Sequence, residues 1–192
     1  VLFRSADDVA KLLDALGIEE PAAIAGISMG GYVAQHVAIQ HPEKVSRLIL
    51  IDTKFSADTP EARESRAHLA ATVGRVGQHV LADAMVPNLL AATDSARSQP
   101  ERTANEEFLR ECIGKQSVAT IQAALKALAD RPDMSEPMQH IEKPVILICG
   151  SEDTITPPAV METMEKILPE GHLLIVPDAG HLVPLEIGRA HV

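Results

Sequence analysis

One short segment combines residue types and spacing that suit nucleophilic catalysis. Gly26-Ile27-Ser28-Met29-Gly30-Gly31 places a serine between glycines two positions before and two positions after it. A sharp strand-to-helix turn of this pattern holds the serine in a strained conformation, and the glycines let the chain pass itself closely. The hydroxyl then lies at a helix N-terminus, where N–H groups favour negative charge. We therefore expect Ser28 to be a nucleophile and the Met29 N–H to be an oxyanion donor.

Two further segments supply the partners that such a serine needs, which are a general base and an acid that orients the base. Gly150-Ser151-Glu152-Asp153 and Ala179-Gly180-His181 each directly follow a short apolar run. Because ligand sites of open parallel sheets lie beyond the carboxyl ends of the strands, we expect both segments to reach Ser28. The pattern predicts His181 as the general base and Asp153 as the acid.

Three other acids are alternatives to Asp153. Asp52 ends the second apolar run, and Glu152 adjoins Asp153 in the sequence. Asp178 lies only three residues before His181, and on so short a loop its carboxylate is poorly placed to reach the ring nitrogen that faces away from the serine. We expect Asp153 to be the acid and retain Asp52, Glu152 and Asp178 as alternatives.

The remaining histidines and the cysteines indicate structural or surface roles. His36 and His41 are five residues apart, which is poor spacing for two metal ligands on one helix. Two cysteines make neither a disulfide framework nor a cysteine-only zinc site. We therefore expect no metal and no organic cofactor, and no catalytic role for this set: His36, His41, His68, His79, His140, His172, His191, Cys112 and Cys149.

Short apolar runs that alternate with helical patterns must position the candidate residues. Strands are expected at 22–27, 45–51, 145–149 and 173–176, and helices at 6–16, 30–40 and 158–168. Continuous apolar strands between helices indicate an α/β fold with a parallel sheet covered on both faces. The last helix is expected to begin at Thr156-Pro157-Pro158, with Thr156 as its N-cap.

A long helical region separates the second expected strand from the third. From about Thr59 to Gln139 the sequence consists of helical segments, which we expect to be broken at Pro87, Pro100, Pro132 and Pro137. We therefore expect an α/β core at 6–53 and 140–186 and an inserted helical cap at 54–139.

Composition and charge exclude several classes of protein. The chain has 192 residues, 46% of them apolar but only 2% aromatic, with a formal net charge of -10. This length suits one domain, and the apolar share excludes a disordered or fibrous chain. The negative charge argues against a nucleic-acid partner, and no apolar run approaches the ~20 residues that span a bilayer. The core must be built from alanine, valine, leucine, isoleucine and methionine.

The two ends of the sequence differ in character from the rest. The chain opens Val1-Leu2-Phe3-Arg4-Ser5 and closes Ile187-Gly188-Arg189-Ala190-His191-Val192, and both strings look like translations of adapter DNA. We therefore expect residues 1–5 and 187–192 to be non-native and the chain to be an N-terminally truncated fragment. Its cellular location is left open, with the cytoplasm as the first expectation.

Much of the chain resembles a known family. Glu19–Glu186 is similar to the C-terminal part of a serine α/β-hydrolase, of the branch with small carboxylesterases, enol-lactonases and cofactor-free haloperoxidase-like enzymes. The matching segments are Gly26–Gly31, Leu48–Asp52, Gly150–Pro157 and Pro177–Glu186. The resemblance implies a partial α/β-hydrolase fold with about four parallel strands and a helical cap. It also implies the same roles for Ser28, Met29, Asp153 and His181.

The implied reaction is hydrolysis of a small-molecule carboxylic ester or lactone through an acyl-enzyme. A C–C bond hydrolase and a cofactor-free perhydrolase use the same three residues and are alternatives, and a ligand-binding, receptor-like relative is the alternative outside enzymes. Serine at position 28, in place of aspartate, separates the chain from haloalkane dehalogenases and epoxide hydrolases.

One departure from the family affects both stability and rate. The family carries further strands and a second oxyanion N–H upstream of the helix expected at 6–16. Losing one oxyanion donor typically costs ~2.7–4 kcal/mol of transition-state stabilisation. The nucleophile strand is expected to lie at an open sheet edge, so we expect this chain to be weakly stable and nearly inactive.

Overall fold

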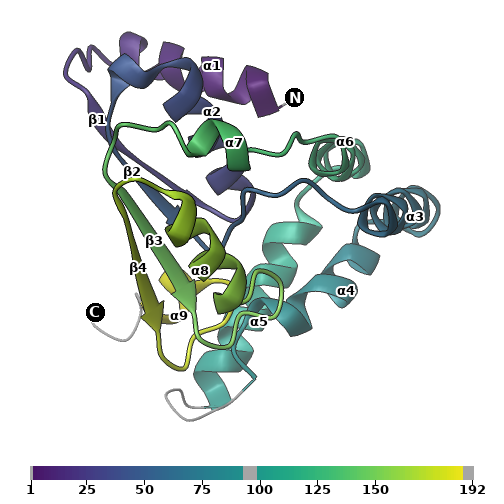
Figure 1. Cartoon of the computed structure of the whole chain (residues 1–192). Helices are drawn as coiled ribbons and strands as arrows, with labels where there is room; N and C mark the ends of the chain where they lie inside the picture. The colour runs from purple at the N-terminus through teal and green to yellow at the C-terminus, as the bar shows by residue number, and fades with distance from the viewer. Residues whose placement is uncertain (1, 93–98, 188–192) are drawn as a thin grey trace.

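Four parallel strands form one sheet in the order β1-β2-β3-β4 (Figure 1). The computed structural model describes residues 2–92 and 99–187. The expected strands are confirmed with small changes at their ends: β1 (Ala22–Ile27), β2 (Val45–Ile51), β3 (Val145–Gly150) and β4 (Gly171–Val176). Within the described residues β1 lies at one edge of the sheet, as expected, and pairs with β2.

Helices separate the strands, so the chain has an α/β architecture. They are α1 (Leu2–Ala15), α2 (Met29–Gln40), α3 (Pro60–Val76), α4 (His79–Leu89), α5 (Gln99–Gly114), α6 (Val118–Ala129), α7 (Ser135–Met138), α8 (Pro158–Ile167) and α9 (Val183–Ile187), with a 3-10 turn at Pro42–Lys44. The first helix starts earlier than expected and includes Leu2–Ser5. Of the ends expected to be non-native, residues 1 and 188–192 lie outside the described residues. Within those residues, no helix combines the length and apolar character needed to cross a membrane.

One face of the sheet is covered by helices. α2 packs against β1 and β2, α8 packs against β3 and β4, and α1 packs against α2. Side chains alternate between the two faces of a strand, so each strand gives every second residue to this face. The main core forms between the helices and these strand residues: Ile24, Leu48, Leu50, Val145, Leu147, Cys149, Leu173 and Ile175.

The opposite face of the sheet is apolar but open. Its side chains are half-buried or exposed in the described structure: Ala25, Ile49, Ile51, Ile146, Ile148 and Leu174. The expected covering of both faces is therefore wrong for the described residues. The reason is that α2 and α8 both return on the same side of the sheet, whereas the helices after β2 lead away from it (Figure 1).

The helices between β2 and β3 have a small core of their own. Figure 1 shows α3 and α6 lying together at the side away from the sheet, and Val73, Leu81, Ile121 and Leu125 form a cluster among these helices. Two short stretches of the expected 54–139 insertion belong to the main core instead, since it includes these residues: Phe55, Met134 and Met138. The helices that pack apart from the sheet therefore lie between these two stretches.

The prolines of this region do not all break helices. Pro100 and Pro137 lie near the starts of α5 and α7, where a helix does not need the missing N–H. Pro87 lies inside α4, which ends two residues later at Leu89. Only Pro132 of the four separates two helices, so the expected breaks at the other three positions are wrong.

A buried ion pair ties the two ends of the insertion together. Arg131 precedes α7, and its guanidinium lies 2.9 Å from the carboxylate of Asp58, which precedes α3. Burial raises the pKa of Asp58, but hydrogen bonds from Arg66 and Arg131 outweigh it and lower that pKa to about 2. The same guanidinium lies 4.4 Å from the ring centre of Tyr32 in α2. These contacts fix the inserted helices to the helix that follows β1.

The one-sided sheet predicts opposite outcomes for two leucines. Leu147 of β3 is fully buried in the main core, whereas Leu174 of β4 is 56% exposed on the open face. We expect Leu147→Ala to lower the free energy of unfolding by about 2–5 kcal/mol, because it leaves a cavity. We expect Leu174→Ala to change it by no more than about 0.5 kcal/mol, as for other surface sites. Urea unfolding followed by circular dichroism measures both, and equal losses would show that the open face is covered.

Candidate active site

Ser28 occupies a strained turn between β1 and α2. Its backbone has φ 48° and ψ -113°, a conformation that residues with side chains rarely adopt. The Ser28 N–H donates to the Ile51 carbonyl at 2.9 Å, and the Thr53 hydroxyl donates to the Ser28 carbonyl at 2.9 Å. Ile51 and Thr53, at the end of β2 and just after it, therefore bind both the backbone N–H and the backbone carbonyl of Ser28.

The glycines around Ser28 are not equally constrained. A Cβ on Gly26 would lie 2.2 Å from the Gly30 carbonyl oxygen, and a Cβ on Gly31 would lie 2.6 Å from the Thr53 hydroxyl. A Cβ on Gly30 would meet no described atom within 4 Å. Close approach of the chain was expected to require glycine at positions 26 and 30. It requires glycine at positions 26 and 31 instead.

Met29 is the first residue of α2. The N–H groups in the first turn of a helix have no acceptor within the helix, and they carry its partial positive charge. The N–H expected to be an oxyanion donor thus belongs to the residue after Ser28, on a helix end that favours negative charge.

His181 contacts both of its expected partners. Its Nε2 lies 2.8 Å from the Ser28 hydroxyl, and its Nδ1 lies 2.9 Å from Oδ2 of Asp153. An ionised carboxylate only accepts hydrogen bonds, so Nδ1 carries the proton and Nε2 has a free lone pair. In this tautomer the imidazole is oriented to accept the proton of the Ser28 hydroxyl.

Asp153 is buried and held in one position by four hydrogen bonds. Its Oδ1 accepts the N–H groups of Ile155 and Thr156 at 2.8 and 3.0 Å. Its Oδ2 accepts the Thr156 hydroxyl at 2.7 Å as well as the His181 ring. Burial raises the pKa of Asp153, but the hydrogen bond and charge of His181, with the Thr156 donors, outweigh burial and lower that pKa below 3.8. The carboxylate therefore stays ionised beside the ring.

Thr156 is a site residue whose role the sequence analysis missed. It was expected to cap α8, but the N-cap of α8 is Pro157, and the Thr156 side chain points to Asp153 instead. Its Oγ1 also lies 3.4 Å from Nδ1 of His181. The signal was local, because aspartate side chains bind backbone N–H groups two or three residues ahead in tight turns.

The three alternative acids have other hydrogen-bond partners. The Asp52 carboxylate accepts the N–H groups of Gly150 and Val183 at 3.0 and 3.3 Å. Glu152 accepts the Ala92 N–H at 3.0 Å, and the Asp178 N–H donates to the Ser151 hydroxyl. The ring nitrogen of His181 that faces away from Ser28 contacts Asp153, so geometry favours Asp153 among the four.

Glu186 is a second residue that the sequence analysis missed. It is buried, and its carboxylate accepts the N–H of Gly180 at 2.6 Å and the N–H of Ala91 at 3.0 Å. Gly180 precedes His181, and Ala91 follows α4. No local sequence pattern predicts this bridge, because Ala91 and Glu186 are 95 residues apart. The bridge places the end of α4 directly against the loop that carries His181.

The residues that offer metal ligands near the site are already engaged. Oxygen and sulfur atoms of Asp52, Cys149 and Asp153 lie within 4.8 Å of one another. Both carboxylates already accept backbone N–H groups. Burial raises the pKa of Cys149 to about 12, which keeps it a thiol, whereas metals bind the thiolate. These groups suit hydrogen bonding within the protein better than metal binding.

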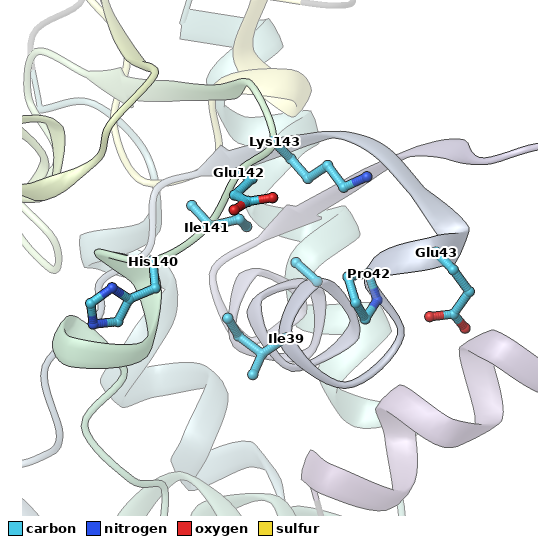
Figure 2. Close-up of a pocket in the computed structure, with 8 residues that line it drawn as sticks. Ile39, Pro42, Glu43, His140, Ile141, Glu142 and Lys143 are labelled. Atoms are coloured by element: carbon cyan, nitrogen blue, oxygen red, sulfur yellow. The ribbon is translucent and has the colours of Figure 1, made fainter.

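A separate pocket lies at the other ends of the strands (Figure 2). Its volume is about 340 Å³, and it is lined by Ile39, Pro42, Glu43 and residues 140–143. These segments precede β2 and β3, so the pocket faces away from Ser28. Figure 2 shows His140 at one side of it and Glu43 at the other. It brings none of the expected catalytic residues together.

Three of the other described histidines have contacts or surroundings apart from the Ser28–His181 contact. His36 is buried in α2, and Nε2 of His41 lies 3.0 Å from Asp7. His140 contacts Glu136 at the surface. His191 lies outside the described residues.

Comparison with known proteins shows which family this chain resembles. A family model described as the alpha/beta hydrolase fold matches residues 2–186. The pimeloyl-(acyl-carrier protein) methyl ester esterase of Nitrosomonas europaea is 29% identical over 168 residues, which cover 83% of this chain and 64% of that protein. The chain therefore spans slightly less than two thirds of this curated relative.

Solved structures show the same likeness. A thermophilic esterase from Thermogutta terrifontis, with malate bound, is 34% identical with a TM-score of 0.91, over 99% of this chain and 68% of that chain. The enol-lactonase of Burkholderia xenovorans LB400 superposes with a TM-score of 0.84 at 24% identity, over 99% of this chain and 69% of that chain, which shows a shared fold.

The turn at Ser28 predicts a difference between two neighbouring glycines. We expect Gly26→Ala to destabilise the protein by about 1–3 kcal/mol or more, because its Cβ would overlap the Gly30 carbonyl. The matched control is Gly30→Ala, which has room for a Cβ and lies inside α2, so we expect it to be neutral or to stabilise by up to about 1 kcal/mol. Urea unfolding of the two variants measures this, and a larger loss for Gly30→Ala would contradict it.

Asp52 predicts a pH dependence of stability. Burial raises its pKa from 3.8 to about 7, although the Gly150 and Val183 N–H groups act against this. The folded state therefore holds this proton more tightly than the unfolded state, so the contribution of Asp52 to stability is largest below pH 4 and falls as pH rises towards 7. We expect the stability of Asp52→Asn relative to wild type to rise over this window, by at most ~4 kcal/mol. Urea unfolding at pH 4.5, 6 and 7.5 measures the difference, and a constant difference refutes the assignment.

Proposed function

Since this chain belongs to the alpha/beta hydrolase family, we propose that it is a serine hydrolase that cleaves a carboxylic ester or a lactone. The observation that carries the proposal is the continuous line of hydrogen bonds from the Ser28 hydroxyl through His181 to Asp153. A nucleophile, a base within 2.8 Å of it and an acid within 2.9 Å of the base form the arrangement that acyl transfer requires.

The first half of the proposed reaction acylates Ser28. Nε2 of His181 accepts the hydroxyl proton while Oγ of Ser28 forms a bond to the carbonyl carbon, and the carbonyl π electrons move to oxygen. The tetrahedral intermediate collapses when the C–O bond to the alcohol breaks and His181 returns the proton to the leaving oxygen. In a lactone, the departing alcohol stays attached to the acyl group through its own chain.

The second half of the reaction repeats these steps with water. His181 takes a proton from water, the hydroxide adds to the acyl carbon, and the bond to Ser28 Oγ breaks as His181 returns the proton to Oγ. Asp153 stays ionised throughout and stabilises the protonated ring. The Met29 N–H, at the start of α2, donates to the oxyanion in both halves.

The substrate class is proposed from the relatives and from the inserted helices. The relatives include two esterases and an enol-lactonase, so an ester or lactone carbonyl is the reacting group we propose. We also propose that the helices between β2 and β3 act as the cap over this site. The Glu186 bridge supports that role, because it joins Ala91, the second residue after α4, to the loop of His181.

The proposal predicts that Ser28 is the residue labelled by a fluorophosphonate probe. We expect the 192-residue chain to be labelled and to hydrolyse p-nitrophenyl acetate slowly, and Ser28→Ala to lose both activities. We expect Asp153→Asn to slow labelling by about 10⁴-fold, because the ring no longer keeps the tautomer that accepts the serine proton. The labelling rate and the mass of the labelled peptide measure the result.

The matched control for Asp153→Asn is Asp178→Asn. Asp178 has a positive φ of 55°, which asparagine tolerates well. It lies on the loop before His181, whose two ring nitrogens contact Ser28 and Asp153. We expect it to label within about twofold of wild type, as surface substitutions usually do. Equal loss in both variants would point to a general effect of charge, and undiminished labelling of Ser28→Ala would refute the nucleophile. A panel of esters, lactones, diketones and peroxide with acetate then separates ester hydrolysis from C–C cleavage and perhydrolysis.

A further inference from the structure

The end of β2 contacts every segment that carries a proposed catalytic residue. The Ile51 carbonyl accepts the Ser28 N–H, and the Thr53 hydroxyl donates to the Ser28 carbonyl. Between these two residues, the Asp52 N–H donates to the Ile148 carbonyl of β3 at 2.9 Å. Three consecutive residues thus bind the Ser28 turn on one side and β3 on the other.

The Asp52 side chain extends these contacts to the other two catalytic segments. Its Oδ1 accepts the Gly150 N–H at 3.0 Å, and Gly150 begins the turn that leads to Asp153. Its Oδ2 accepts the Val183 N–H at 3.3 Å, two residues after His181. The two loops also meet directly, since a Cβ on Gly150 would lie 2.1 Å from the Gly180 carbonyl oxygen. One fully buried carboxylate therefore holds both loops where they touch.

We propose that Asp52 is a positioning residue of the active site, whose carboxylate fixes the loops of Asp153 and His181 against the strand end that holds Ser28. The proposal rests on the proposed function of the three residues. Asp52 acts through backbone N–H groups, and its carboxylate takes no part in the line of hydrogen bonds from Ser28 to Asp153.

The contact geometry requires a carboxylate in particular. Each of the two oxygens of an ionised aspartate accepts one N–H in this position. Asparagine has a single acceptor oxygen, so its amide NH₂ would face one of the two backbone donors. Protonation of Asp52 has a similar effect, because one oxygen becomes a hydroxyl donor. Asp52 therefore holds the two loops best when it is ionised.

The groups around Asp52 make this ionisation sensitive to pH. The ionisable groups that act on it are Asp153 and His181, and Asp52 in turn acts on the Cys149 thiol. Burial, with the Asp153 charge, raises the pKa of Asp52 to about 7, against the Gly150 and Val183 N–H groups and the His181 charge. The positioning contact is then formed over the same pH range in which imidazole bases ordinarily lose their proton.

The test compares Asp52→Asn with Asp178→Asn in the 192-residue chain. Both positions have a positive φ, 46° and 55°, which asparagine adopts readily, so neither change strains the backbone. We expect Asp52→Asn to lower the fluorophosphonate labelling rate and kcat by about 10- to 100-fold, with KM changed by less than threefold, because the misplaced ring affects chemistry more than binding. Asp178→Asn is expected to match wild type in each.

The pH profile separates positioning from a loss of folded protein. Between pH 5 and 8 the wild-type labelling rate should depend on two ionisations, so the steepest slope of log rate against pH exceeds one. In Asp52→Asn only one ionisation remains and the slope is one. A general destabilisation lowers the amount of folded protein, which circular dichroism measures, and leaves this slope unchanged.

A second readout does not require activity. The Nδ1–H proton of His181, hydrogen-bonded to Asp153, gives a downfield NMR resonance, and the Gly150 and Val183 amides are protected from exchange with solvent. Loss of that resonance and of Val183 protection in Asp52→Asn, with both kept in Asp178→Asn, supports the proposal. If both variants retain the resonance, the amide protection and the wild-type slope, the proposal is overturned. If wild type is not labelled at Ser28, the proposed function fails, and the NMR comparison alone decides whether Asp52 positions the ring.

Discussion

The hydrogen bond between Asp153 and Nδ1 of His181 is the interaction on which the proposed chemistry depends. It fixes the tautomer of the ring and so leaves Nε2 free to accept the Ser28 proton. The bond forms only if two loops that follow different strands meet at one edge of the sheet. The parallel register of β2, β3 and β4 aligns their carboxyl ends, and the glycines at 150 and 180 allow the two loops to touch. The sheet therefore sets the 2.9 Å distance between Nδ1 of His181 and Oδ2 of Asp153.

Features with a local cause could be predicted from the sequence. The four strands are runs of apolar residues whose lengths and limits depend on their own composition, and they lie where the pattern indicated. Ser28 was recognisable because a strained turn needs glycine at a specific neighbour, Gly26, where a Cβ would meet backbone at 2.2 Å. His181 and Asp153 were recognisable because each follows a strand, and the carboxyl ends of parallel strands converge. In each case the structural requirement produces a recognisable sequence pattern within a few residues of the site.

Features that depend on distant contacts could not be predicted in this way. Periodicity marks the strands as apolar on both faces, but it does not show that α2 and α8 return on the same side and leave Leu174 exposed. Proline does not by itself end a helix, and its effect depends on how far along the helix it lies, as Pro87 and Pro137 show. Glu186 binds a backbone N–H 95 residues away, and no spacing rule connects the two positions. These features follow from packing between segments, which single residues do not encode.

Two neighbouring carboxylates illustrate how the environment divides roles between identical side chains. Oxygens of Asp52 and Asp153 lie within 4.8 Å of each other, both side chains are buried, and both accept backbone N–H groups. Their pKa values nevertheless shift in opposite directions, because Asp153 has the His181 ring and the Thr156 hydroxyl as direct donors, whereas the N–H groups bound to Asp52 offset only part of the effect of burial. Two like charges so close disfavour a second ionisation, so the carboxylate that accepts the ring N–H and the threonine hydroxyl keeps its charge. The hydrogen-bond partners of each aspartate, rather than its residue type, therefore determine its role. Asp153 orients the imidazole, and Asp52 holds the two loops in place.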